Sequence, residues 1–242
     1  MASVAEHYEH LLAEHYSWLF GGFGTKVAEN REFFKAHSIT PRNGSVAVDL
    51  GPGPGFQSIP LAQSGFSVIA IGLNEKLLNE LQLNSKGLSI KTVQDDLTKF
   101  ASHCTIDIEL CVCMGDTLTH LNSKGLVVKL FKDIHGALEE EGKVVLTYRD
   151  LTNELTDLER FMQVKSDQHT IFTCFLEYET DTVKVHDLIY EHSNNGWTFK
   201  KSSYRKLRLS PEWVISELEN TGYKVSFSNV ERGFVAIIAD KN

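Results

Sequence analysis

The stretch VAVDLGPGPGFQSIPLA, at residues 46–62, decides the fold of this 242-residue chain. An apolar run ends at Asp49, and glycines then occupy every second position, at Gly51, Gly53 and Gly55. Such glycines let the backbone pass close to a ligand, and the start of a following helix offers free N–H groups. The stretch therefore predicts a strand, a ligand-binding loop and a helix, in that order.

The chain on both sides of this loop alternates between short apolar runs and helical patterns. Two helical segments precede the loop, the second at 26–37. We expect strands at 45–50, 68–71, 89–93, 106–113 and 143–148, with helices at 57–63, 74–83 and 126–138. This alternation is typical of βαβ units in a parallel sheet covered on both faces. Glu109 interrupts the fourth run, and we expect it to be paired or partly solvated because burying a lone carboxylate is costly.

The pattern changes after Arg149. Residues 170–178, 182–192 and 197–209 read as three strands, and Asn195-Gly196 is a typical hairpin turn. We therefore expect a three-stranded antiparallel meander, inserted at 165–209. A helix starting at Ser210-Pro211, and two strands at 223–228 and 233–239, then close the chain.

Composition restricts the class of protein. The formal net charge is −8, which disfavours nucleic acid as a partner, and 42% of the residues are hydrophobic, which is enough for a core. The four cysteines form no CxxC pair and read as reduced core thiols. The first residues carry no basic and apolar leader pattern, and no apolar run reaches membrane length. We expect a cytoplasmic protein that binds neither nucleic acid nor a membrane.

Two glycine-loop families fit this sequence poorly. A dinucleotide loop of the GxGxxG type wants Gly or Ala where this chain has Phe56, and no GxxxxGK[ST] phosphate loop is present. The acid followed by three alternate glycines resembles the first motif of the class I S-adenosylmethionine (SAM)-dependent methyltransferases. The resemblance covers 45–240 apart from the insertion. It implies one doubly wound α/β domain over 1–242, with a mostly parallel seven-stranded sheet whose last strand is antiparallel.

The resemblance also implies SAM as the cofactor and assigns residues to it. The glycine loop would wrap its amino-acid part, and the residues after the fourth strand would line its methionine end. Asp96 takes the place of an acid that accepts from the adenine amino group, or alternatively it only caps the turn before Thr98. The full set expected at the cofactor is Asp49, Gly51, Gly53, Gly55, Gly72, Asp96, Leu97 and Met114.

One position departs from the family pattern and keeps alternatives open. Gly72 stands at the end of the second strand, where the family usually has an acid that binds the ribose hydroxyls. Asn74 or Glu75 is a possible replacement. The first interpretation is methyl transfer to an unidentified small molecule, and the second is a methyltransferase-fold binding protein with impaired catalysis. A nucleotide-dependent oxidoreductase is the third, and Phe56 counts against it.

Candidate groups for catalysis follow the fourth and fifth strands. His120 is a candidate general base because imidazole titrates near physiological pH, or it merely starts a helix. Tyr148 and Arg149 end the fifth strand, and Arg149 is expected to hold an anionic group of the acceptor, or else to be a surface charge. The resemblance implies that residues 1–40 form a helical lid and that the meander caps the acceptor site. We expect no bound metal.

Overall fold

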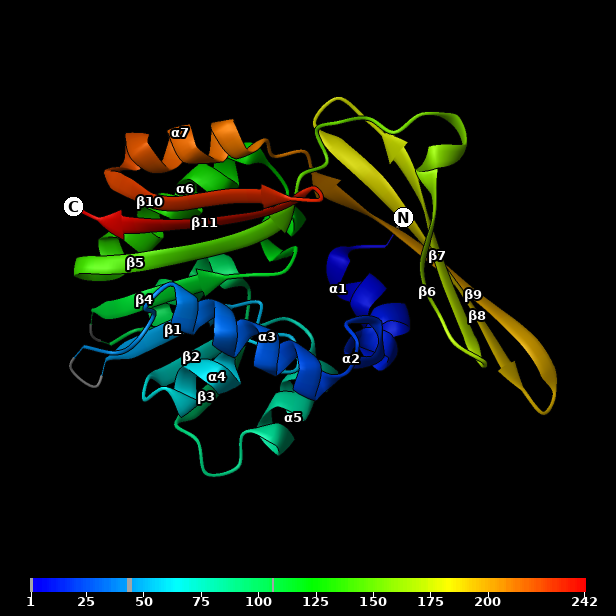
Figure 1. Cartoon of the computed structure of the whole chain (residues 1–242), viewed down its shortest axis with the longest axis horizontal. Coiled ribbons are helices and arrows are strands. Elements are labelled where there is room, and N and C mark those ends of the chain that lie inside the picture. The colour runs from blue at the N-terminus through cyan, green and yellow to red at the C-terminus, as the bar shows by residue number, and fades with distance from the viewer. Residues whose placement is uncertain (1, 43–44, 106) are drawn as a thin grey trace.

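The computed structural model describes residues 2–42, 45–105 and 107–242, and its largest element is a seven-stranded sheet (Figure 1). The sheet order is β10-β11-β5-β4-β1-β2-β3, and β11 runs antiparallel to both of its neighbours while the other pairs are parallel. This confirms the expected doubly wound sheet with its antiparallel last strand. The strands are β1 (Val46–Leu50), β2 (Ser67–Gly72), β3 (Ile90–Gln94), β4 (Ile108–Cys113), β5 (Leu138–Arg149), β10 (Tyr223–Glu231) and β11 (Phe234–Lys241). Ile106, where we expected β4 to begin, lies outside the described residues.

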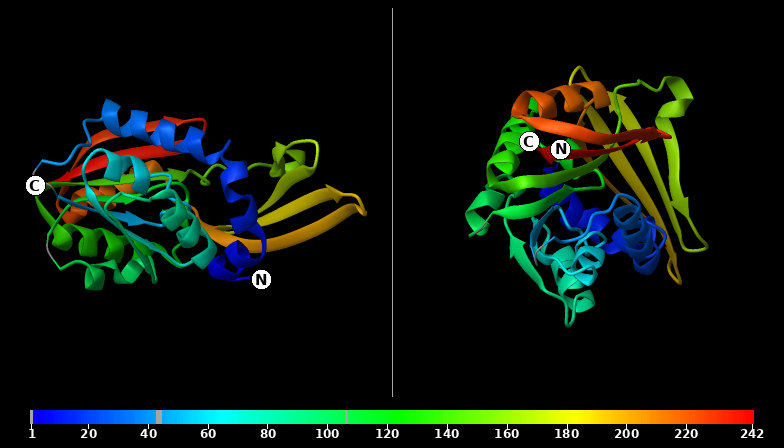
Figure 2. Two further views of the ribbon diagram at one scale, coloured as in Figure 1. Left: turned by 90° about the horizontal axis from the view of Figure 1, so that it is seen from below. Right: turned by 60° about the vertical axis from the view of Figure 1, so that its left-hand side comes forward.

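Helices cover both faces of this sheet (Figures 1 and 2). One face packs against α6 (Lys124–Ala137), α7 (Pro211–Thr221) and the 3₁₀ segment η3 (Leu97–His103). The other packs against α3 (Phe23–Ala36), α4 (Ser58–Gln63) and α5 (Glu75–Asn84). Because both faces are covered, the central strands are buried along almost their whole length, which explains why their residues are mostly apolar, with Asp49 and Glu109 as exceptions.

A second sheet of four antiparallel strands stands beside the first (Figure 1). It consists of β6 (Phe161–Ser166), β7 (Thr170–Tyr178), β8 (Thr182–Ser193) and β9 (Gly196–Leu207). The prediction of three strands was wrong by one, because β6 was missed. The sequence of β6, FMQVKS, has no regular apolar alternation, and a bulge between Gln163 and Lys165 interrupts its pairing with β7.

The N-terminal segment lies between the two sheets (Figure 2) and changes its helical pitch three times. It runs through α1 (Val4–His7), the π-helical η1 (Tyr8–Leu12), the 3₁₀ segment η2 (Ala13–His15) and α2 (Tyr16–Leu19). Ser3 and Glu6 form the expected capping box. The single regular helix that we expected is therefore wrong. The segment packs on both sides, and the π turn brings both Leu11 and Leu12 against the second sheet.

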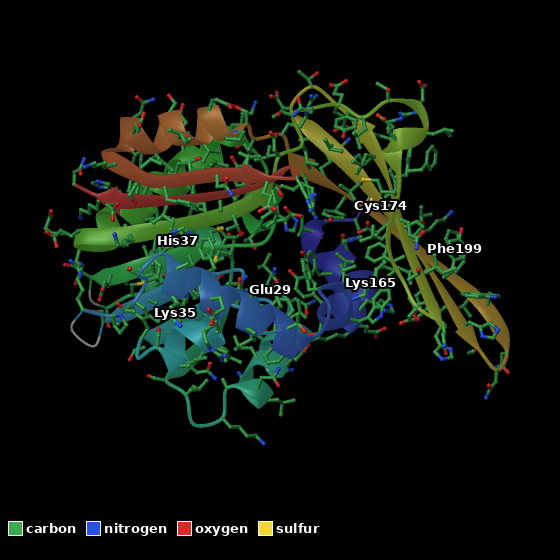
Figure 3. All side chains as sticks on the ribbon, in the orientation of Figure 1. Glu29, Lys35, His37, Lys165, Cys174 and Phe199 are labelled. Atoms are coloured by element: carbon green, nitrogen blue, oxygen red, sulfur yellow. The ribbon has the colours of Figure 1, made fainter. Side chains whose placement is uncertain are left out.

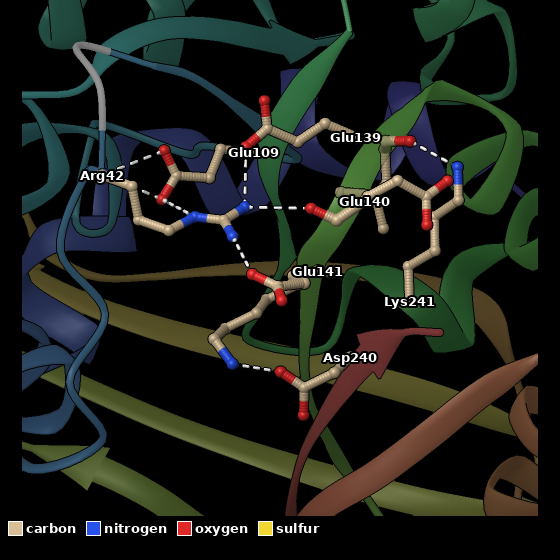
Figure 4. A network of polar contacts seen from close by, with 9 residues as sticks. Arg42, Glu109, Glu139, Glu140, Glu141, Asp240 and Lys241 are labelled. Atoms are coloured by element: carbon tan, nitrogen blue, oxygen red, sulfur yellow. Dashed lines mark hydrogen bonds and ion pairs between the residues drawn. The ribbon is translucent and has the colours of Figure 1, made fainter.

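Charged residues at the edge where the parallel strands begin are paired with one another (Figure 4). Glu109 on β4 is 6% exposed and accepts hydrogen bonds from the Arg42 backbone nitrogen at 3.0 and 3.1 Å and from Nε at 3.3 Å. The same guanidinium reaches Glu139 at 2.7 Å and Glu141 at 2.8 Å. Glu109 is thus paired, as expected. No helix in the described part of the chain is long and apolar enough to cross a membrane.

Candidate functional site

A cavity of about 340 Å³ lies at the opposite edge, where β1, β2 and β3 end. In open α/β sheets this edge carries the ligand crevice. Five of the eight residues expected at a cofactor line it, namely Gly51, Gly53, Gly72, Asp96 and Leu97. The N-terminal segment closes one side with residues that include Val4, Tyr8 and Tyr16.

The glycine loop forms a wall of bare backbone. Gly51 has a φ of +80°, and a Cβ there would lie 2.4 Å from Oγ1 of Thr117. Gly53 has a φ of +54°, and its Cβ would lie 3.1 Å from the ring of Tyr16. Left-handed φ values together with crowding exclude side chains at both positions, so a ligand along this wall would meet backbone atoms. Gly55 lies behind the wall, where a Cβ would clash with Leu81 of α5 at 2.4 Å.

Two acids that follow β3 differ in how far they are already engaged. Asp95 is bound by His103 at 2.9 Å and by Lys99 at 3.1 Å, and the hydrogen bond with His103 is the main cause that lowers its pKa to about 2. Asp96 accepts from the nitrogen and hydroxyl of Thr98 through Oδ1 alone, at 2.8 and 2.7 Å. Its Oδ2 has no hydrogen-bond partner among the described residues. Asp96 thus caps η3 and also retains a carboxylate oxygen for a ligand.

Asp49 and Met114 lie behind the cavity rather than on its wall. Asp49 is fully buried, accepts a hydrogen bond from Ser58 through Oδ2, and has a buried Oδ1 without a partner in the described chain. Burial raises its pKa to about 7. Met114 is buried in the core that β4 shares with α3 and α4. Both residues shape the loop from below.

Asn74 does not replace the acid that the family usually has at the end of β2 to bind the ribose hydroxyls. Gly72 lines the cavity with no side chain, and a Cβ there would lie 3.2 Å from the ring of Pro52. The Oδ1 atom of Asn74 caps α5 at the Leu77 nitrogen, and its amide nitrogen donates to Glu9 at 3.1 Å. The side chain of Asn74 is therefore committed to holding α5 and the N-terminal segment in place.

His120 lies in η4 (Thr117–His120), at the end of the cavity beside the N-terminal segment. Its ring meets those of Tyr8 and Tyr204 edge-on, with centroids 5.7 and 5.6 Å away. Its Nε2 is buried and has no partner among the described residues. Burial, followed by the nearby ammonium of Lys206, lowers the pKa of His120 to about 3. The imidazole is therefore neutral and can accept a hydrogen bond, but it is a weak base.

An ion pair joins the second sheet to this end of the cavity. Lys206 on β9 reaches Oδ2 of Asp116, after β4, at 2.6 Å. Burial disfavours the carboxylate, but Lys206 outweighs it and the pKa of Asp116 is lowered to about 2. Oδ1 of Asp116 accepts from the backbone nitrogen of Arg149 at 2.8 Å. The pair fixes the ends of β4, β5 and β9 relative to one another.

Tyr148 and Arg149 do not line the cavity. Alternation along β5 turns Tyr148 into the core beneath α6 and α7, where it is fully buried and where burial raises its pKa. The side chain of Arg149 is exposed at the strand end, and its link to Asp116 is through the backbone. The structure thus separates these two residues from His120 and from the cavity.

The sequence interpretation missed a buried pair between His7 and Asp187. Nε2 of His7 lies 2.9 Å from Oδ2 of Asp187, and the two residues are 0% and 4% exposed. A signal was present in β8, where Val183, Val185, Asp187 and Ile189 occupy alternate inward positions. A carboxylate in such an apolar alternation predicts a buried partner.

Comparison with known proteins agrees with this geometry. Residues 47–142 match the family model described as a methyltransferase domain. They include the glycine loop, Asp96 and His120. This part of the chain is therefore similar to known methyltransferase domains.

Curated relatives and solved structures are also similar to this chain. A glycine/sarcosine N-methyltransferase of Aphanothece halophytica is 26% identical over 121 residues, which are 49% of this chain and 45% of that relative. The chain spans about half the length of the curated relatives it matches. A SAM-dependent methyltransferase structure from Clostridium acetobutylicum has a TM-score of 0.71 at 15% identity, covering 98% of this chain and 97% of its own.

A structure of SAM-bound CalS10, an amino pentose methyltransferase of Micromonospora echinaspora, has a TM-score of 0.73. It is 12% identical and covers 91% of this chain and 92% of its own. At these identities the two structures show a common fold that extends over the second sheet.

Proposed function

We propose that the chain is an enzyme that transfers the methyl group of SAM to a small-molecule acceptor and releases S-adenosylhomocysteine. The observation that carries this proposal is the cavity itself, in which a side-chain-free glycine loop faces Asp96 with an unused carboxylate oxygen. The names of the relatives support it, since they include N-methyltransferases and a SAM-bound enzyme.

The residues present fit SAM, with Asp96 accepting from the adenine amino group and the backbone at Gly51 and Gly53 beside the amino-acid part. SAM supplies a methyl group on a positively charged sulfur, which is ready for direct displacement. His120 and Tyr8 lie at the end of the same cavity, where they would meet the acceptor. Holding two reactants in an attack geometry can supply roughly 7–11 kcal/mol of the barrier reduction.

The N-terminal segment would act as a lid in this reaction. It covers the cavity through Val4, Tyr8 and Tyr16, and contacts such as those of Glu9 with Asn74 and Lys76 tie it to α5. Its other side packs on the second sheet through Leu11 and Leu12. Movement of the segment would admit ligands, and its return would exclude water from the site. A cavity of about 340 Å³ favours a small acceptor over a polymer.

Gly72 keeps one alternative function open, a methyltransferase-fold protein that binds but does not catalyse. Without a carboxylate at this position, the ribose hydroxyls lose a charged hydrogen-bond partner, which is worth about 1.5–3 kcal/mol. The cavity retains its other contacts, so we expect binding to be weakened rather than abolished.

Calorimetric titration tests the proposal and separates it from its rivals. SAM, S-adenosylhomocysteine and NADH are titrated into the full chain, and methyl transfer from radiolabelled SAM to small acceptors is measured in parallel. Binding of the two adenosyl compounds together with turnover supports the enzyme. Binding with no turnover of any acceptor supports the impaired protein, and binding of NADH alone contradicts both.

A further inference from the structure

Four aromatic rings meet where the N-terminal segment, η4 and β9 come together. The ring of His7 lies against Tyr204 at 4.1 Å between centroids, Tyr204 meets His120 at 5.6 Å, and His120 meets Tyr8 at 5.7 Å. Tyr8 and His7 close the circuit at 6.2 Å. We call these four residues the ring cluster. Tyr8 and His120 also line the cofactor cavity, so the cluster adjoins the place where a methyl group would be transferred.

Two buried nitrogens in the ring cluster have no hydrogen-bond partner in the described chain, Nδ1 of His7 and Nε2 of His120. Buried polar atoms are nearly always satisfied, and each exception costs about 1–3 kcal/mol. His120 lines the cavity, whereas His7 does not and instead contacts the lining residue Tyr8. The unpartnered Nε2 of His120 therefore indicates that a polar group of a ligand completes it.

His7 and His120 differ in their ability to accept a proton. An ionised carboxylate only accepts hydrogen bonds, so Nε2 of His7 carries the hydrogen that Asp187 receives, and Nδ1 is a bare lone pair. A proton added at Nδ1 would create an imidazolium beside the Asp187 carboxylate, which stabilises it. His120 has no carboxylate in hydrogen-bond contact and lies near the ammonium of Lys206, so it stays neutral.

We propose that the ring cluster binds the nucleophile of a primary amine acceptor, that Nε2 of His120 accepts one of its N–H groups, and that the His7–Asp187 pair takes the proton released by methylation. This inference rests on the proposed methyl transfer. A nitrogen with two hydrogens satisfies both lone pairs, whereas an alcohol has one hydrogen and would need a strong base to attack. The ring of Tyr8, which lines the cavity, favours the cationic product.

The step balances without another reactant. The lone pair of the neutral amine attacks the methyl carbon, the N–C bond forms, and the C–S bond breaks with its electron pair moving to sulfur. The sulfonium becomes the neutral thioether of S-adenosylhomocysteine, and the acceptor becomes an ammonium. Its N–H bond then breaks, the electron pair stays on nitrogen, and the proton passes to Nδ1 of His7 directly or through one water.

The pH dependence of the step depends on the groups around His7. From β8, Asp187 favours the charged imidazole, and from β9, Lys206 opposes it while being offset by Asp116. Other titratable groups around the pair include Tyr8, His120, Cys174 and Tyr204, and burial raises the pKa of Tyr8, Cys174 and Tyr204, which keeps them neutral. We therefore expect substitution of His7 to change the acid limb of the rate.

Nuclear magnetic resonance of ¹⁵N-histidine in the full chain bound to S-adenosylhomocysteine tests the assignment directly. His7→Gln and His120→Gln identify the two signals, and the glutamine introduced by His7→Gln can still donate to Asp187. We expect His7 to be protonated on Nε2 alone at neutral pH, and His120 to remain neutral at mildly acidic pH. A hydrogen on Nδ1 of His7, or a charged His120, would overturn the proposal. Failure of the ligand to bind would instead count against the proposed function.

Kinetics with matched acceptors provide the second arm. Small primary and secondary amines and the corresponding alcohols are offered with SAM, and S-adenosylhomocysteine release is measured against pH. We expect turnover of primary amines and a loss of roughly 10²- to 10⁴-fold in kcat for His7→Gln, with an acid limb that then reflects only protonation of the amine, while the affinity for S-adenosylhomocysteine is kept. Asp187→Asn should move the acid limb of the rate to lower pH, because it removes the carboxylate that favours the charged imidazole. Turnover of alcohols in place of amines, or an unchanged pH profile in His7→Gln, would overturn it.

Discussion

Both edges of the seven-stranded sheet carry buried polar side chains. These are hydrogen-bonded in a network at one edge, and some of them lack partners at the other. At the edge where the parallel strands begin, Arg42 satisfies Glu109, Glu139 and Glu141 in one network (Figure 4). At the edge where they end, polar atoms such as Oδ1 of Asp49 and Nε2 of His120 are buried without partners in the described chain. Pairing within the Arg42 network serves the stability of the fold, and the unpaired atoms of Asp49 and His120 mark the edge that is left for a ligand.

The glycine loop is where we expect the largest effect. Gly51→Ala places a Cβ 2.4 Å from Thr117 on a backbone with a φ of +80°. Overpacking and the left-handed conformation together cost roughly 2–5 kcal/mol, and the loop must also move away from its ligand. Urea unfolding and S-adenosylhomocysteine titration measure both effects.

A matched glycine separates the two causes. Gly115 has a φ of +77°, but a Cβ there would meet nothing within 4 Å. Gly115→Ala should therefore show the conformational cost alone and keep its affinity. Equal losses in the two variants would mean that the close approach at Gly51 has no special role.

Asp49 should make the ligand edge sensitive to pH. Burial raises its pKa from 3.8 to about 7, so between about pH 4 and pH 7 the folded state holds a proton that the unfolded state has already released. The contribution of Asp49 to the free energy of unfolding therefore falls as the pH rises through this window, by about 1.4 kcal/mol for each pH unit. Asp49→Asn should gain stability over the wild type at pH 8 and little at pH 4.

The Asp49 prediction is checked by urea unfolding at both pH values, with Asp133→Asn on the exposed side of α6 as the control. A stability difference between Asp49→Asn and the wild type that does not change with pH would show that Asp49 is ionised in the folded protein.

Substitutions at the edge where the parallel strands begin should lower the free energy of unfolding without affecting function. Arg42→Met leaves the buried Glu109 with its backbone hydrogen bonds alone, and we expect a loss of about 1–3 kcal/mol. The double variant Arg42→Met/Glu109→Leu should recover much of it, because a buried ion pair can be replaced by apolar packing. Chemical unfolding measures the free energy of unfolding of each variant. A lower value in the double variant than in Arg42→Met would contradict this account.

Gly72→Asp should have the smallest effect. The new Cβ lies 3.2 Å from Pro52, a contact that a shift of a few tenths of an ångström relieves. The added carboxylate can bind the ribose hydroxyls, and we expect the affinity for S-adenosylhomocysteine to rise by about tenfold. Calorimetry of the two proteins decides whether the missing acid matters, since an unchanged affinity would mean that other groups already bind the ribose.

Local sequence signals predicted the seven-stranded sheet and the glycine wall well. An apolar run closed by Asp49 and alternate glycines has few structural solutions, and βαβ units then fix the order of the strands. The second sheet was less predictable, because β6 lacks alternation and forms only by pairing with β7. The sequence predictions were best at positions such as the loop glycines, where the backbone conformation alone restricts which residue fits.

Contacts between distant segments could not be predicted in the same way. His7 and Asp187 are 180 residues apart, and Lys206 reaches Asp116 across 90. Nothing local to His7 indicates its partner. The site at the acceptor end is therefore a product of how the N-terminal segment and the second sheet pack together (Figure 3). There Lys165 on β6 donates to the carbonyl of Trp18 in α2.

Thermal unfolding with and without S-adenosylhomocysteine tests the contrast between the two edges most directly, in the wild type, Asp96→Asn and Arg42→Met. The asparagine of Asp96→Asn keeps the cap on Thr98 but lacks the charged oxygen, so the affinity of this variant should fall roughly tenfold to a hundredfold. Ligand at about 100 times the wild-type Kd should stabilise the wild type and Arg42→Met by about 2.7 kcal/mol each, and Asp96→Asn far less. Equal stabilisation of all three proteins, or none in the wild type, would contradict the placement of the cofactor at this edge.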